Sequence, residues 1–252
     1  MKQLNLRTPK AYDRSLEAET ENARVRFYLV TEGATEESYF DGINNNKRLL
    51  NIKNNIFVEV VPKEEGEESF SHPYQLVLAA LRLMGRIDKN GKEIPENQWE
   101  ANCKWDYDKD TDIMCVIFDR DYKNLETHLD LIYELCVKNN IYIGISNPNF
   151  ELWLLMHFAD IDKYDRDLLY RNPKNIRNQF FEDASVNKKY LEILVSRSAN
   201  GYKKGSSLKF ERFIEGIPMA IEQEKHFEEG FENLKENLGS NIGRLVAKIK
   251  SN

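Results

Sequence analysis

Residues 113–121 read Ile-Met-Cys-Val-Ile-Phe-Asp-Arg-Asp, an apolar run that ends in two carboxylates one residue apart. The run has the length of a buried strand. If the backbone stays extended, Asp119 and Asp121 share one face at the carboxyl end of this strand, where open α/β sheets keep their binding crevices. The pair therefore predicts either a site for a divalent cation or a solvated turn that caps the next helix.

The composition limits the kinds of partner that this chain can have. The 252 residues are 41% hydrophobic, enough for one substantial domain with an appendage or for two small domains. The formal net charge of −6 argues against a generally basic surface, so any contact with nucleic acid must be local. The three cysteines have no metal-ligand spacing, which favours a reducing, cytoplasmic location. No apolar stretch approaches the roughly 18 residues that span a bilayer, so no membrane contact is expected.

A second carboxylate follows an earlier predicted strand. Residues 25–31 are rich in aromatic and β-branched side chains, which predicts a strand, and Glu32 and Gly33 come directly after it. Gly33 permits a tight turn, and Glu36 suits the positive end of the helix that follows. Glu32 is therefore either a strand-end carboxylate comparable to Asp119 or an ordinary turn residue beside a glycine.

Strand-like and helical segments alternate through the first 160 residues. This alternation is typical of a largely parallel sheet with right-handed crossovers. Residues 87–112 are too long for an ordinary connection, and insertions of this kind often overhang a site. The predicted strands are 25–31, 55–62, 113–121 and 141–145, and the clearest helices are 73–86 and 125–136.

The strand predicted at 141–145 leads into Ser-Asn-Pro-Asn-Phe-Glu-Leu-Trp, residues 146–153. Asn147 is a good helix cap, and Pro148 fits the first helical position. Glu151 then lies one turn into this helix, near its N-terminus, and is expected to face the same crevice as the aspartates.

Strand signals largely vanish after residue 160. We therefore predict a flexible leader at 1–23, an α/β domain at 24–160 and a helical region at 161–252, with a long helix at 207–234. Residues 171–210 hold nine Lys or Arg and three Asp or Glu, a local charge of +6. A contact with a phosphate backbone needs such a reversal of charge, although a solvated basic helix face explains it equally well.

The sharpest part of this basic stretch is Gly-Tyr-Lys-Lys-Gly, residues 201–205. Flanking glycines let the backbone approach an anion while two lysines neutralise it. The candidate residues for contact with an anionic substrate are Lys188, Lys189, Tyr202, Lys203 and Lys204.

Several of these motifs together resemble the RloB family, also found as the second protein of the AbiL abortive-infection system. The resemblance rests on Glu32-Gly33, on Asp-Arg-Asp at 119–121 and on residues 146–153. Residues 201–204 and 237–246 are also similar to family signatures, although the latter lacks an expected proline and threonine. The resemblance covers most of the chain.

The resemblance implies a Toprim-like domain, a Rossmann-like and mostly parallel sheet flanked by helices, here with a C-terminal helical extension. In Toprim sites a glutamate and an Asp-x-Asp pair gather around magnesium, and these residues map onto Glu32, Asp119 and Asp121. The glutamate is often assigned general acid or base work. The Asn-Pro-x-Phe-Glu element makes Asn147 and Glu151 further candidate site residues.

Two functions are compatible with these features. The first is a nuclease of an anti-phage system, which hydrolyses DNA or RNA with Mg²⁺ or Mn²⁺ held by the three mapped carboxylates. Glu151 would then hold a second metal or position water, while Lys203 and Lys204 would bind phosphate or stabilise the transition state. The second function is a non-catalytic subunit that binds a nucleotide or an ATPase. The resemblance implies a partner ATPase in both cases, and self-association is left open.

The cation hypothesis also makes predictions about the two aspartates and the arginine between them. Asp119 and Asp121 repel each other without a cation, so Asp119→Ala is expected to stabilise the metal-free protein modestly. Arg120 should point away from both if the backbone is extended.

Overall fold

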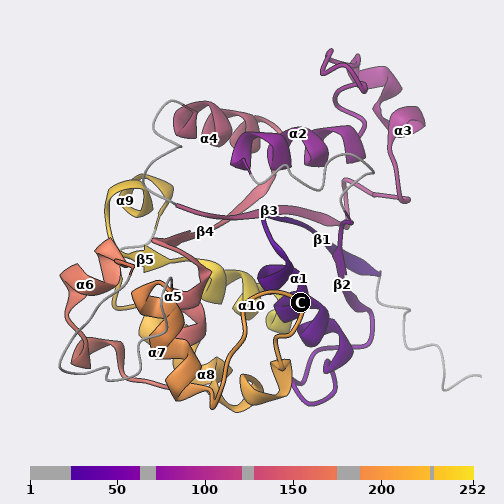
Figure 1. The fold of residues 1–252 in the computed structure, drawn as a ribbon. Coiled ribbons are helices and arrows are strands. Elements are labelled where there is room, and N and C mark those ends of the chain that lie inside the picture. Colours follow the sequence, from indigo (N-terminus) through magenta and orange to yellow (C-terminus); the bar gives the residue numbers. More distant parts are fainter. Residues whose placement is uncertain (1–23, 63–71, 121–127, 175–187, 228–229) are drawn as a thin grey trace, which may run out of the picture.

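The computed structural model describes residues 24–62, 72–120, 128–174, 188–227 and 230–252. Within these residues the chain forms a five-stranded sheet with helices on both faces (Figure 1). The strand order is β2-β1-β3-β4-β5, in which the first four strands are parallel and β5 is antiparallel to β4. The predicted α/β fold with a mostly parallel sheet is confirmed. The strands are β1 (Val25–Thr31), β2 (Ile56–Val60), β3 (Ile113–Asp119), β4 (Tyr142–Asn147) and β5 (Gly239–Ser240).

The helices divide between the two faces of the sheet (Figure 1). One face is covered by α2 (Pro73–Leu83), α4 (Leu129–Lys138) and α9 (Phe231–Glu236). The other is covered by α1 (Ala34–Asn45), α5 (Phe150–Leu155), α6 (Arg166–Arg171), α7 (Tyr190–Ser198), α8 (Ile217–Glu224) and α10 (Ile242–Ser251). Helices from both sides of residue 160 thus share one core, and the domain boundary there stays a prediction. None of the helices in the described ranges combines the length and apolar character needed to cross a bilayer.

Strand β3 is apolar from Ile113 to Phe118 because both of its faces are covered. Cys115 and Ile117 pack with α1 and α5, whereas Met114, Val116 and Phe118 pack with α2 and α4. Alternation along the strand then places Asp119 on the same face as Ile117, beside α1 and α5.

The C-terminal helical region is present, but it differs in detail from the prediction. The single helix expected at 207–234 is broken into the short 3₁₀ helices Phe210–Arg212 and Ile214–Gly216, then α8 and α9. Strand β5 was not predicted, because a two-residue strand has no periodic pattern. It is held at the edge of β4 by Asn241, whose Nδ2 donates to Ile143 O at 2.8 Å and whose Oδ1 accepts from Ile145 N at 2.7 Å.

The insertion at 87–112 lies at the amino ends of the strands. Arg26 N, near the start of β1, donates to Asp112 Oδ1 at 3.0 Å, and Arg26 Nη1 donates to Asp106 O at 2.9 Å. Tyr28 Oη donates to Trp105 O at 2.7 Å. Asp119 lies at the opposite, carboxyl end of β3. The expectation that the insertion overhangs the predicted site is therefore wrong.

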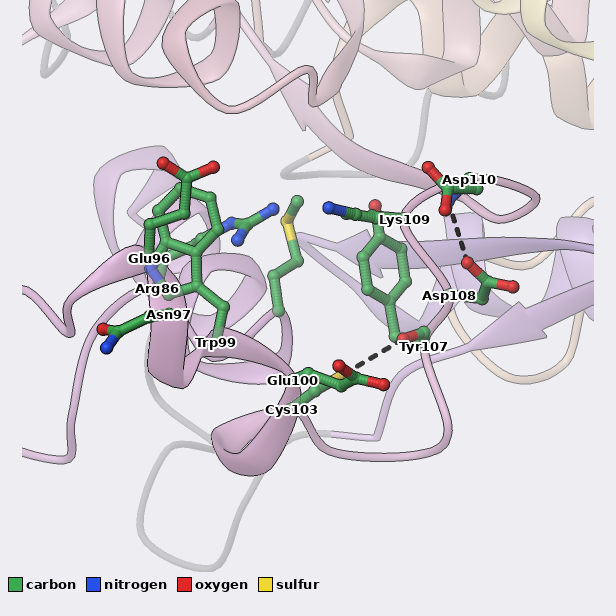
Figure 2. A pocket seen from close by; sticks show the side chains of 11 residues that line it. Arg86, Glu96, Asn97, Trp99, Glu100, Cys103, Tyr107, Asp108, Lys109 and Asp110 are labelled. Carbon is green, nitrogen blue, oxygen red and sulfur yellow. Dashed lines mark hydrogen bonds between the residues drawn. The ribbon is translucent and has the colours of Figure 1, made fainter.

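Trp99, which lies in the short helix α3 (Trp99–Asn102), anchors the insertion. The guanidinium of Arg86 stacks 3.4 Å from the centre of its ring, and Trp99 Nε1 donates to Ile94 O at 2.7 Å. Figure 2 shows Arg86 and Trp99 across from Tyr107 and Lys109, around a pocket of about 590 Å³. Trp99 therefore fixes the insertion to the domain surface.

A buried carboxylate joins the C-terminal helices to each other. Glu224, at the end of α8, accepts hydrogen bonds from Gly243 N and Arg244 N at 2.8 and 2.9 Å. Both amides belong to the first turn of α10 and have no partner within that helix. Burial nevertheless raises the pKa of Glu224 from 4.5 to about 7, although these hydrogen bonds oppose the rise.

This pKa predicts that Glu224 makes stability depend on pH. The folded state holds the proton more tightly than the unfolded state, so stability falls as pH rises from about 4.5 to 7. Because glutamine imitates the protonated acid, the stability of Glu224→Gln relative to wild type should rise by about 3 kcal/mol between pH 5 and pH 8. Urea unfolding at several pH values measures this difference.

Glu222 provides a control on the same helix. Its carboxylate is exposed and pairs with Lys225, so Glu222→Gln should gain no stability over wild type as pH rises. If the free energies of unfolding of Glu224→Gln and wild type change with pH in parallel, Glu224 does not cause the pH dependence of stability.

Candidate active site

Glu32 lies against the carboxyl end of β3, although it follows β1. Its backbone N donates to Ile117 O at 3.0 Å, which continues the pairing of β1 with β3 by one residue. Its side-chain Oε2 accepts a hydrogen bond from Asp119 N at 3.0 Å. The two predicted strand-end acids are therefore neighbours, although 87 positions separate them in the sequence.

Asp119 links this strand end to helix α5. Its Oδ1 accepts a hydrogen bond from Phe150 N at 2.8 Å, and Phe150 is the first residue of α5. This is a capping contact, but to a helix from a later part of the chain and not to the segment that follows Asp119. Asp121, the other aspartate of the predicted pair, lies outside the described residues.

Glu151 enters the same site from the first turn of α5. It is 1% exposed, and its Oε1 accepts from Tyr202 Oη at 3.1 Å and pairs with Lys204 Nζ at 3.3 Å. The loop that carries these two residues is also fixed to α1, because Gly205 N donates to Thr35 Oγ1 at 2.8 Å. Two residues of the predicted anion-binding segment thus contact a predicted site carboxylate.

Glu36 is a further acid of this site that the sequence analysis did not select. It is buried in the first turn of α1, and a Cβ at Gly33 would lie 3.1 Å from Glu36 Oε2. Burial, together with the nearby carboxylates of Glu151 and Glu32, raises the pKa of Glu36 to about 8. Its position could have indicated this role, since Glu36 lies in the first turn of α1 as Glu151 lies in the first turn of α5.

The four acids together form a carboxylate cluster, defined by Glu32, Glu36, Asp119 and Glu151. Burial raises the pKa of Asp119 well above its usual value, and the other three carboxylates raise it further. Burial alone would lower the pKa of Lys204, but Glu151 and Asp119 outweigh this effect and raise it. The arrangement concentrates negative charge around one half-exposed ammonium group, so an additional cation would stabilise it.

The donor atoms of the site are those that Mg²⁺ and Mn²⁺ prefer. Three oxygens at the end of β1 and the start of α5 are buried without a hydrogen-bond partner: Thr31 Oγ1, Asn149 Oδ1 and the second carboxylate oxygen of Glu151, Oε2. Oxygen ligands of this kind suit hard cations. Among the described residues, however, no three His, Cys, Asp or Glu side chains are gathered at metal-ligand spacing. The site thus fits a metal by its chemistry, while a complete ligand set is not assembled within the described ranges.

Two predicted residues have structural contacts outside the cluster. Asn147 Nδ2 donates to Leu234 O at 2.8 Å, on the face of the sheet that α9 covers. The predicted cap by Asn147 is wrong, because α5 is preceded by Asn149. Arg120 also points away from the carboxylates, as expected, since its Nε donates to Lys235 O at 2.9 Å.

The remaining predicted lysines are placed elsewhere. Lys188 and Lys189 lie just before α7, where Lys189 forms an isolated bridge with Lys174. Lys203 is exposed and lines a separate pocket beyond Tyr202. Of the described lysines predicted to contact substrate, Lys204 is therefore the one placed at the cluster. The roles predicted for all these residues stay predictions.

Fold and site together define an α/β protein with an acidic cluster where its parallel strands end, beside a lysine-bearing loop. The chain belongs to the family of RloB-like proteins, whose family model matches residues 27–249. Comparison with curated proteins and with solved structures gives no match.

Proposed function

We propose that the protein is a metal-dependent nuclease, which hydrolyses phosphodiester bonds of DNA or RNA in anti-phage defence. The observation that carries this proposal is the carboxylate cluster, in which four acids from two strand ends and two helix starts lie together and one of them, Glu151, pairs with Lys204. The RloB-like family suggests a defence-associated role. The partner ATPase rests on the same resemblance, and the cytoplasmic location rests on cysteine usage.

In this proposal Glu32, Asp119 and Asp121 hold Mg²⁺ or Mn²⁺. The bound ion would polarise the phosphate and lower the pKa of an attacking water. Lys204 would neutralise a phosphate oxygen, because its ammonium is fixed 3.3 Å from Glu151 and stays about half exposed. Glu151, held by Tyr202 and Lys204, would position the water, and Glu36 supplies an additional carboxyl for a second ion or for proton transfer.

The alternative is a non-catalytic subunit that recognises a nucleotide or a partner ATPase through the same acidic site. Both functions use the cluster, so the decisive difference is cleavage.

Cleavage assays separate the two functions. The purified protein is incubated with mixed DNA and RNA in Mg²⁺, in Mn²⁺ or in chelator, with and without the proposed partner ATPase. We expect metal-dependent cleavage that Lys204→Ala lowers at least about 100-fold. Lys225→Ala, which removes an exposed lysine paired with Glu222, should retain full activity. Intact substrates under every condition, together with metal-dependent stabilisation of the protein, would favour the non-catalytic subunit.

A further inference from the structure

The loop at 201–209 directs its two adjacent lysines to different places. Lys204 reaches Glu151 in the carboxylate cluster, whereas Lys203 lines a pocket of about 230 Å³ on the other side of Tyr202. Lys209, Arg212 and Ser207 also line this pocket. Every charged side chain in its lining is basic, so we call it the basic pocket.

The cations of the basic pocket have no acidic partner among the described residues. In the described part of the chain none of Lys203, Lys209 and Arg212 forms an ion pair. Arg212 is nevertheless fixed, because its Nη1 donates to Ala199 O at 2.6 Å and Asn200 O at 2.7 Å. The rest of its guanidinium keeps donors for a ligand. Three positive charges around one hollow, in a chain of net charge −6, mark a place that attracts an anion.

The backbone of the pocket is also suited to close approach. Gly201 has a φ of +94°, a conformation that favours glycine, and a Cβ built there meets nothing within 4 Å. The main chain at Gly201, which also lines the pocket, therefore has open space beside it. The loop is held on its other side by the bonds of Tyr202 to Glu151 and of Gly205 to Thr35. The pocket thus has a fixed position relative to the carboxylate cluster.

We propose that the basic pocket binds a phosphate group of the nucleic-acid backbone, next to the phosphodiester that the carboxylate cluster cuts. This rests on the proposed nuclease function. Lysine and arginine donors around a small polar hollow are typical of phosphate recognition, because charge-assisted hydrogen bonds to phosphate are strong. Tyr202 joins the two sites, because its hydroxyl donates to Glu151 and the residue also lines the pocket. Lys203 thus binds and positions the strand, and Lys204 alone serves the reacting phosphate.

Binding measured as a function of salt tests this inference. Fluorescence anisotropy with labelled single-stranded and duplex oligonucleotides, in chelator to prevent cleavage, compares wild type with a Lys203→Ala, Lys209→Ala double variant. We expect affinity to fall on the order of tenfold, and the slope of log affinity against log salt to fall by about one for the lost phosphate contact. The matched control is Lys163→Ala with Lys225→Ala, which removes the same charge from exposed ion pairs and should leave affinity and slope close to wild type. Equal losses in both double variants would overturn the inference, since they would reflect net charge alone.

A second arm separates a backbone phosphate from a free anion. Inorganic phosphate at millimolar concentration should compete only weakly with the oligonucleotide, and strong competition that abolishes oligonucleotide binding would overturn the assignment to the backbone. Failure of the nuclease proposal looks different. Wild type would then bind oligonucleotide through Lys203 and Lys209 but cleave nothing in Mg²⁺ or Mn²⁺. If instead wild type cleaves and the lysine variant binds and cleaves equally well, the pocket assignment alone fails.

Discussion

Asp119→Ala should abolish metal-dependent cleavage and also destabilise the protein when metal is absent. Loss of a carboxylate ligand is expected to lower the rate at least about 1,000-fold. The substitution also removes the acceptor for Phe150 N at the start of α5, which should cost about 1 kcal/mol. The modest stabilisation expected from the sequence considered only repulsion between aspartates, and this hydrogen bond changes the sign. Activity assays and thermal melts in chelator measure the two effects.

Asp119→Asn separates these two contributions. The asparagine oxygen can still accept from Phe150 N. The asparagine has no negative charge, so the repulsion by the carboxylates of Glu32, Glu36 and Glu151 is removed. In chelator this variant should therefore be at least as stable as wild type. Excess Mg²⁺ should raise the melting temperature of wild type but of neither Asp119 variant. Asp110→Ala is the control, because Asp110 lies in the insertion at the amino ends of the strands. This variant should keep full activity and a wild-type response to Mg²⁺. An equal Mg²⁺ response in Asp119→Asn would disprove the role of Asp119 as a ligand.

Gly42→Ala should destabilise the protein by about 3 kcal/mol or more, despite the higher helix propensity of alanine. A Cβ at Gly42 would lie 2.1 Å from Phe210 Cγ and 2.4 Å from Phe210 Cβ. Neither atom is the far end of a flexible side chain, so relief requires movement of α1 away from the 3₁₀ helix at Phe210–Arg212. Urea unfolding measures the loss in free energy.

Asp41→Ala is the matched control, because Asp41 precedes Gly42 in α1 and is exposed. This change should stay within about 0.5 kcal/mol of wild type. If Gly42→Ala were as stable as Asp41→Ala, the close packing of Phe210 on α1 would be contradicted. Since α1 also carries Glu36, Gly42→Ala should impair activity in proportion to the displacement of this helix.

The sequence predicts the centre of the fold well and its long-range contacts poorly. The residues of β3 before Asp119 are apolar because both faces of that strand are covered, and this local pattern is sufficient to predict the strand. Glu36 was missed because the direction of its side chain depends on the space beside Gly33. The contact of Asn147 with Leu234 joins residues 87 positions apart, which no local pattern reveals. The position of the insertion likewise depends on contacts of Arg26 and Tyr28 with residues about 80 positions away.

The pairing of β4 with β5 has a consequence for the order of events during protein synthesis. Ile143 O and Ile145 N, on the outer edge of β4, find their partner in Asn241, almost 100 residues later. An emerging chain therefore carries an open sheet edge until that segment leaves the ribosome, and open edges invite pairing with other chains. The charge of Glu151 is likewise compensated only after Tyr202 and Lys204 have been synthesised. The carboxylate cluster is consequently completed late in translation, so incomplete chains would lack the assembled cluster, and with it the proposed activity, inside the cell that makes them.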